Sequence, residues 1–193
     1  MKAICVFCGS SPGFDPVYRE IAVEMGREVV RRHLRLVYGG GNIGLMGALA
    51  DSVLEAGGEV VGVIPQPLVD KEVAHRWLSE LIIVGTMHER KARMADMADA
   101  FVAMPGGFGT FEEFCEVVTW TQLGVHAKPC GVLNVNGFYD PLLALFDRAL
   151  ADGFLRAEHR GLVLTERTVP GILDRVTQAR PVKIDKWIDR SRT

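Results

Sequence analysis

Residues 34–47, with the sequence LRLVYGGGNIGLMG, pass from a short apolar run through a cluster of glycines into an amphipathic segment. The apolar run Leu34–Tyr38 is typical of a buried β-strand, and the glycines that follow it end the strand. Asn42 is a suitable N-cap for a helix after the glycines. Residues 100–113, AFVAMPGGFGTFEE, show the same order of strand, glycine turn and helix. Both segments predict the strand–turn–helix unit of an α/β protein.

The remainder of the chain alternates in the same way. Further strands are predicted at Lys2–Phe7, Val60–Ile64, Leu81–Val84, Pro129–Val135 and Leu162–Leu164. Helices are predicted after Asp15-Pro16, from Thr86 to about Ala98, and over Tyr139–Ala151 and Val169–Thr177, whereas residues 66–80 are polar and irregular. Continuous apolar strands that alternate with helices predict a Rossmann-like, doubly wound fold with a mainly parallel sheet of about seven strands and helices on both faces.

Length and charge limit the possible functions. The 193 residues suit one domain spanning 1–193, and the net charge of -2 gives no reason to expect nucleic-acid or membrane binding. No apolar run approaches the roughly 18 residues of a membrane span, and the apolar start is too short for a signal peptide. We therefore expect a cytoplasmic protein.

The four cysteines and five histidines do not suggest a metal site. Cys5 and Cys8 form a C-x-x-C, but this separation places the two side chains on opposite faces of a strand. The histidines show no metal-ligand spacing. No metal and no cofactor are expected.

Three turns after predicted strands are rich in small residues: Cys8–Ser11, Gly39–Gly47 and Pro105–Thr110. Glycine allows the backbone to approach a phosphate closely, and a helix start presents free N–H groups to it. Gly39, Gly41 and Gly44 satisfy G-x-G-x-x-G, but they follow the second strand, and the third strand ends in Pro65-Gln66 without an acid for a ribose. A mononucleotide is therefore favoured over NAD, and no ATPase P-loop is present.

Several polar and aromatic residues have an ordinary structural interpretation. Thr110-x-x-Glu113 has the spacing of a capping box, which by spacing alone is favoured over a catalytic carboxylate. Arg90 by itself is favoured as a solvated charge. Trp77 and Trp120 are expected in the core or at an interface rather than against a base.

With these residues in view, the chain resembles the LOG ("Lonely Guy") family, the cytokinin riboside 5'-monophosphate phosphoribohydrolases. The resemblance covers nearly the whole chain in order and is carried by FCGSS at 7–11, GGGNIGLMG at 39–47, MHERK at 87–91 and PGGFGTFEE at 105–113, the family's P-G-G-x-G-T-x-x-E signature. The combination is far more specific than any one glycine loop.

The resemblance implies hydrolysis of the N-glycosidic bond of an adenine-type nucleoside 5'-monophosphate, AMP or N6-modified AMP, to the free base and ribose 5-phosphate. It also implies a homodimer. Many such proteins carry the label lysine decarboxylase. That chemistry usually needs pyridoxal phosphate on a lysine, and nothing around the lysines of this sequence suggests such a site.

The resemblance also implies the site residues. Arg90 and Glu113 would be the catalytic pair, in which a carboxylate stabilises an oxocarbenium-like ribose or activates water. Arg90 would hold Glu113 ionised or clamp a substrate oxygen. The substrate and its phosphate would be bound by Gly9, Ser10, Gly40, Gly41, Glu72, Lys91, Gly106, Gly107, Phe108, Gly109, Thr110, Glu112 and Thr119.

Two alternatives remain open from the sequence. An AMP nucleosidase without a cytokinin role would share every catalytic residue. A non-catalytic nucleotide-binding or carrier module on the same fold would not require Arg90 and Glu113 together.

Overall fold

The computed structural model describes residues 1–69 and 74–179. Its strands are β1 (Ala3–Phe7), β2 (Arg35–Tyr38), β3 (Val60–Pro65), β4 (Glu80–Val84), β5 (Ala100–Ala103), β6 (Cys130–Leu133) and β7 (Val163–Glu166). Its helices are α1 (Val17–Arg31), α2 (Gly44–Glu55), α3 (Gln66–Val69), α4 (Met87–Met97), α5 (Phe108–Gln122), the short 3₁₀ turn η1 (Val135–Gly137), α6 (Asp140–Ala151), α7 (Ala157–Arg160) and α8 (Val169–Gln178).

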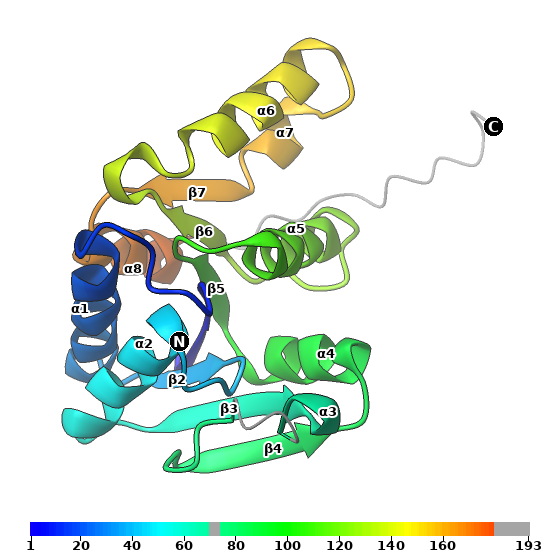
Figure 1. Ribbon diagram of the computed structural model, residues 1–193. Coiled ribbons are helices and arrows are strands. Elements are labelled where there is room, and N and C mark those ends of the chain that lie inside the picture. Colours follow the sequence, from blue (N-terminus) through cyan, green and yellow to red (C-terminus); the bar gives the residue numbers. More distant parts are fainter. Residues whose placement is uncertain (70–73, 180–193) are drawn as a thin grey trace.

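All seven strands form one parallel sheet in the order β4-β3-β2-β1-β5-β6-β7 (Figure 1). The chain builds one half outward from β1 to β4 and then returns to place β5 on the other side of β1. The loops after β1 and β5 therefore lead away in opposite directions, and ligands bind at such switch points of doubly wound sheets. The predicted fold class is confirmed, with the sheet fully parallel.

Helices cover both faces of the sheet. One face packs against α1, α2 and α8, and the other packs against α4, α5 and the start of α6 (Figure 1). β1 is buried along its whole length because it lies at the centre of both layers. Cys5 and Cys8 belong to different hydrophobic clusters, as their spacing predicted, and both are free thiols.

Most predicted boundaries hold within one or two residues. The capping box at Thr86 and Glu89 is confirmed, with Glu89 N donating to Thr86 Oγ1 at 3.1 Å. The prediction of Asn42 as an N-cap is wrong, because α2 begins at Gly44 with extended Ile43 as its cap. The sequence analysis also missed the four-residue helix α7.

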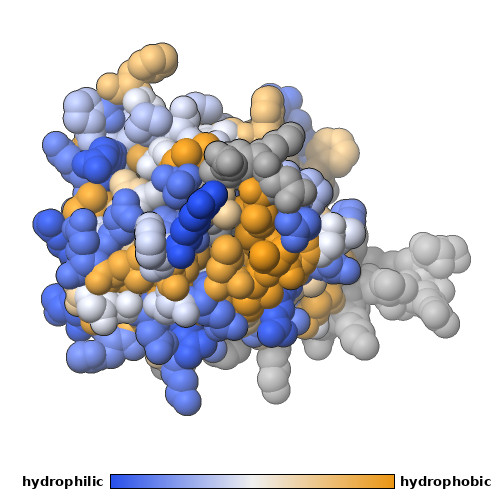
Figure 2. Space-filling view, turned by 60° about the horizontal axis from the view of Figure 1, so that its bottom comes forward, coloured by the Kyte–Doolittle hydropathy of each residue, from blue (hydrophilic) through white to orange (hydrophobic). Residues whose placement is uncertain are grey.

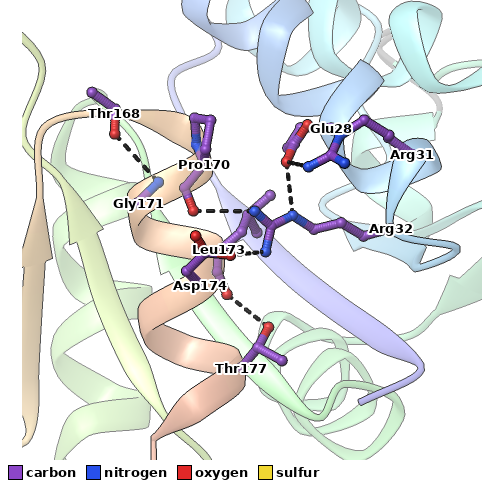
Figure 3. Close-up of polar contacts among 9 residues, drawn as sticks. All are labelled: Glu28, Arg31, Arg32, Thr168, Pro170, Gly171, Leu173, Asp174 and Thr177. Carbon is purple, nitrogen blue, oxygen red and sulfur yellow. Dashed lines mark hydrogen bonds and ion pairs between the residues drawn. The ribbon is translucent and has the colours of Figure 1, made fainter.

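An ion-pair cluster joins α1 to α8 (Figure 3). Glu28 on α1 accepts hydrogen bonds from Arg31 Nε at 2.6 Å and from Arg32 Nε at 2.8 Å. Arg32 also reaches α8, where it pairs with Asp174 Oδ1 at 2.6 Å and donates to Pro170 O at 3.2 Å. Hydrogen bonds from Arg31 and Arg32 hold the pKa of the nearly buried Glu28 carboxyl at about 2, against the opposing effect of burial.

We expect Glu28→Gln to lower the free energy of unfolding by roughly 1–3 kcal/mol at neutral pH, because charge-assisted hydrogen bonds are lost. The pKa of Glu28 is depressed on folding, so this contribution is complete above the usual value of 4.5 and is lost as pH falls toward about 2. Urea unfolding of both proteins across this window should show the difference shrinking. Glu24→Gln, an exposed glutamate on the same helix, is the control, and a pH-independent difference would contradict the assignment.

No helix within the described ranges is long and apolar enough to cross a membrane.

Candidate active site

A pocket of about 410 Å³ opens at the carboxyl ends of the central strands. It lies beside the switch point between β1 and β5, where the three glycine-rich turns meet. Its lining comes from the ends of β1, β2 and β3, from α3, and from the first two turns of α2, α4 and α5. The lining residues are Cys8, Gly9, Ser10, Gly39, Gly41, Ile43, Met46, Ile64, Leu68, Met87, Arg90, Gly107, Phe108, Gly109, Thr110, Glu112 and Glu113.

The three turns are bonded to one another through Gly9. Its N–H donates to Pro105 O at 3.1 Å, and its carbonyl accepts from Leu45 N at 3.0 Å. Gly44 has φ +62°, and a Cβ there would lie 2.3 Å from the backbone of Ser10. Glycine is thus required for the contact between the first two turns, which explains part of the glycine pattern without a ligand.

Gly107 and Gly109, unlike Gly44, are not required by contacts within the protein. A Cβ at either position would meet nothing within 4 Å, and neither residue has a positive φ. Neither the backbone nor the packing requires glycine there. Since both residues line the pocket at the start of α5, the missing side chains leave room for a ligand to approach the backbone N–H groups of that helix.

Arg90 and Glu113 form an ion pair at the wall of this pocket. Arg90 Nη1 lies 2.9 Å from Glu113 Oε1, and the two residues are only 9% and 7% exposed. Arg90 Nε also donates to Val63 O on β3 at 3.1 Å. The interpretation of Arg90 as a solvated charge is therefore wrong, because this side chain is buried and extends from α4 to Val63 on β3 and Glu113 on α5.

The capping-box interpretation of Thr110 and Glu113 is also wrong. α5 begins at Phe108 with extended Gly107 as its N-cap, so Thr110 and Glu113 both lie inside the helix. A capping box needs its threonine at the N-cap itself. Because α5 starts two residues before Thr110, Glu113 lies in the second turn of the helix, where its side chain pairs with Arg90.

The electrostatics of Glu113 are set by burial and by its neighbours. Burial raises the pKa of Glu113 above its usual value, and the Arg90 guanidinium counteracts this shift only in part. Oε1 is buried, and no residue in the described part of the chain hydrogen-bonds to it, since the nearby Arg90 group lacks hydrogen-bond geometry. The oxygen is paired with the Arg90 charge, and it can still accept a hydrogen bond from a ligand or from water.

Lys91 lies behind this pair rather than in the pocket. Its ammonium is bound by Glu112 and by Glu116 Oε1, the latter at 3.0 Å. Burial lowers the pKa of Lys91, but the hydrogen bonds that its ammonium donates to the two carboxylates outweigh this effect and raise the pKa overall. The positive charge that the resemblance placed at the phosphate is thus paired with two carboxylates of α5.

The other predicted residues are distributed as follows. Gly106 lines a neighbouring pocket of about 330 Å³ that shares Gly9, Ser10 and Gly107 with the first. Gly40 stands next to the pocket, where its carbonyl accepts from His75 N at 2.8 Å. Thr119 is exposed on α5 and donates to Cys115 O at 2.7 Å, away from the lining. The prediction for Glu72 lies outside the described residues.

The sequence analysis missed the apolar side of the pocket: Ile43, Met46, Ile64, Leu68 and Met87. Their signal was position, since each lies near the carboxyl end of a strand or near the start of the helix that follows one. Phe108, which was predicted, is 92% exposed at the rim. Trp77 is 83% exposed, so it does not lie in the core, and its place at an interface stays a prediction.

A larger cavity of about 640 Å³ lies at the opposite edge of the sheet, where the strands begin. Its charged lining residues are Lys2, Arg35, Glu59 and Asp99, with the last bound to the backbone of Lys2 and Ala3. It contains no counterpart of the buried pair, and parallel sheets bind ligands at the other edge. The smaller pocket is therefore the candidate active site.

Comparison with known proteins identifies relatives over nearly the whole chain. Residues 46–176 match the family described as "Possible lysine decarboxylase". A probable cytokinin riboside 5'-monophosphate phosphoribohydrolase of Oryza sativa subsp. japonica is 52% identical over 181 residues, covering 94% of this chain and 80% of the relative. A cytokinin riboside 5'-monophosphate phosphoribohydrolase of Arabidopsis thaliana is 47% identical over 191 residues, covering 99% and 83%.

Solved structures agree on the fold. The X-ray structure of TM1055 matches with a TM-score of 0.70 and 25% identity, covering 93% of this chain and 100% of that one. The molybdenum cofactor carrier protein of Chlamydomonas reinhardtii matches with a TM-score of 0.69 and 22% identity, covering 92% and 96%, which is a likeness of fold alone. The resemblance seen in the sequence is confirmed by the curated relatives: the chain belongs to the LOG family of cytokinin riboside 5'-monophosphate phosphoribohydrolases.

Proposed function

We propose that this protein hydrolyses the N-glycosidic bond of adenine-type nucleoside 5'-monophosphates, including N6-modified cytokinin nucleotides, to the free base and ribose 5-phosphate. The observation that carries the proposal is the buried Arg90–Glu113 pair, which faces a pocket between the glycine turns in a chain about half identical to named phosphoribohydrolases.

In the reaction, the bond from ribose C1' to the base nitrogen breaks and the electron pair leaves with the base. Positive charge develops on the ribose, and the carboxylate of Glu113 stabilises it or takes a proton from the attacking water. The hydroxyl of water ends on C1' and its proton on the base. Arg90 keeps Glu113 ionised in a buried site, or clamps a substrate oxygen.

The phosphate is assigned to the start of α5. The first turn of a helix leaves N–H groups without an intrahelical acceptor, and here they belong to Phe108, Gly109 and Thr110. Ser10 lies on the adjoining turn. Glu112 lines the same pocket and anchors Lys91, so the roles of these two residues are structural support for the site rather than direct charge on the phosphate.

The base is assigned to the apolar side of the pocket. Ile43 and Met87 are each 44% exposed there, and Met46, Ile64 and Leu68 complete the wall. Such a surface packs against the plane of a purine and gains from a hydrocarbon group on N6. This composition supports an N6-modified adenine as well as adenine itself.

The direct test is incubation with AMP and with isopentenyladenosine monophosphate, followed by chromatography of the free bases and assay of ribose 5-phosphate. We expect both products in equal amounts. Faster release from isopentenyladenosine monophosphate would favour the cytokinin role, and release from AMP alone would favour a plain AMP nucleosidase. Binding of nucleotides without any release would favour the non-catalytic carrier alternative.

Replacement of Gly109 by valine tests the glycine turn. Because a Cβ at this position meets no protein atom, the variant should fold normally and place its side chain in the pocket. We expect AMP binding to weaken by roughly 10–100-fold, since one or two charge-assisted hydrogen bonds are lost. Calorimetry on the folded variant measures this, with Ala157→Val in the first turn of α7 as the control. Unchanged affinity would mean that the turn has no part in binding.

A homodimer in the cytoplasm is proposed as the state in which the protein works. β4 is an edge strand, and Ile83 on it is 49% exposed. Figure 2, which brings the lower side of Figure 1 forward, shows hydrophobic residues gathered into an extended area. Exposed areas of this kind are typical of protein interfaces. Sedimentation at micromolar concentration should give about twice the chain mass of 21.2 kDa.

A further inference from the structure

Gly39, at the end of β2, lies directly against the guanidinium group of Arg90. A Cβ built on Gly39 would stand 2.0 Å from Arg90 Nη2 and 3.1 Å from its Cζ. The first distance is shorter than real Cβ contacts, and the second is tighter than most of them. The backbone of Gly39 does not lie in the left-handed region, so its conformation alone would accept any residue. Among the described residues, the three atoms nearest to such a Cβ, chain neighbours aside, all belong to Arg90.

Three elements thus confine the Arg90 side chain. β3 supplies the carbonyl of Val63, which accepts from Nε at 3.1 Å. α5 supplies Glu113, whose Oε1 lies 2.9 Å from Nη1. Gly39, directly after β2, lies beside Nη2 with no side chain of its own. The guanidinium is thus held by a hydrogen bond and an ion pair, and it occupies the space that a side chain at position 39 would fill.

We propose that Gly39 is a positioning residue: its missing side chain gives the Arg90 guanidinium the space in which it reaches Glu113. The proposal rests on the proposed function, in which Arg90 and Glu113 form the catalytic pair. Gly39 itself touches neither reacting atom, and its effect passes through Arg90. This role differs from that of Gly44, which is required by backbone contact with Ser10.

The effect of Gly39→Ala should be confined to the site. The atoms that a new methyl group would displace form the far end of a flexible side chain, so the fold can accommodate the change by moving Arg90. A shift of about 1 Å at a reacting centre can cost on the order of 10²-fold in rate. We expect kcat to fall by roughly 10–10²-fold. The melting temperature should stay close to that of the wild type.

Gly161→Ala is the matched control. Gly161 has no positive φ, and its nearest contact to a new Cβ would be an ordinary 3.4 Å, at the end of α7 and outside the pocket lining. This variant should retain both stability and kcat. An active Gly39→Ala enzyme with wild-type kcat would overturn the proposal. An inactive wild type would instead overturn the proposed function.

A second readout does not depend on turnover. Within the described residues, the charged groups that act on Glu113 are Arg90 and Lys91 from α4 and Glu112 and Glu116 from α5. The buried thiols of Cys5 on β1 and of Cys8, directly after β1, also lie within its field. Of these, Arg90 is the group that lies directly against Gly39. Withdrawal of the guanidinium should therefore raise the pKa of the Glu113 carboxyl further.

Carbon-13 NMR titration of glutamate carboxyls in four proteins measures this: the wild type, Gly39→Ala, Arg90→Ala and the double variant. We expect the pKa of Glu113 to rise in both single variants. The double variant should match Arg90→Ala, because the alanine at 39 then has nothing to displace. An unchanged pKa in Gly39→Ala, or an additive further rise in the double variant, would show that Gly39 does not act through Arg90.

Discussion

Glu113→Gln is expected to lower kcat by roughly 10²–10⁴-fold while the chain remains folded, because glutamine keeps the shape of the side chain but cannot act as a carboxylate base. The residue is 7% exposed, and an amide oxygen can replace Oε1 beside Arg90. The helix start is unaffected, since Gly107 and not Thr110 is the N-cap of α5. Turnover should therefore be compared per folded molecule, with folding followed by circular dichroism.

Glu55→Gln, at the exposed far end of α2, provides the control and should keep wild-type turnover. The pH profile gives a second check. Burial raises the pKa of Glu113, so a reaction that needs its ionised form loses activity as pH falls through that raised value. The residual activity of Glu113→Gln should not show this loss at low pH. Full activity per folded molecule in the variant would refute the catalytic role.

The 5'-phosphate is expected to be required, so that adenosine and isopentenyladenosine are cleaved far more slowly than their monophosphates. The first turn of α5 has three backbone N–H groups without an acceptor inside the helix, those of Phe108, Gly109 and Thr110. Ser10 lines the same pocket. Each hydrogen bond to a charged group contributes about 1.5–3 kcal/mol, and a factor of ten corresponds to about 1.4 kcal/mol. Loss of three such bonds would lower kcat/KM by roughly 10³–10⁶-fold.

Part of this loss should fall on kcat itself. The phosphate does not react, but its binding energy can hold the ribose against Glu113, so a nucleoside would also be poorly oriented. Release of free base from nucleoside and nucleotide at equal concentrations measures the effect. Lys91→Met offers a matched comparison: because its charge is already paired with Glu112 and Glu116, the preference for the nucleotide should survive. Equal rates on adenosine and AMP would contradict phosphate anchoring.

Elements with a strong local signal were predictable from the sequence. The run Leu34–Tyr38 and the capped segment from Thr86 became β2 and α4 with small boundary changes. Apolar continuity and capping act over a few residues, so they can be read without the fold. The glycine turns were found for the same reason, although only the structure separates Gly44, needed for packing, from Gly107 and Gly109, which face open space.

The errors concern contacts between residues far apart in the sequence. Spacing alone made Thr110 and Glu113 a cap and Arg90 an exposed charge, because a local pattern cannot reveal that α4 and α5 converge at the edge of the sheet. For the same reason the sequence could not show that Lys91 pairs with Glu112 of α5 or that Trp77 lies on the surface of the chain.

The sequence by itself determined the order of strands and helices, the parallel sheet, the three glycine turns and the family to which the chain belongs, since each depends on short-range pattern or on the identity of residues. The tertiary structure decided the rest. The order β4-β3-β2-β1-β5-β6-β7 brings the turn after β1 beside the turn after β5. That crossover buries Arg90 against Glu113 and Gly39, because burial and pairing depend on which elements become neighbours in space.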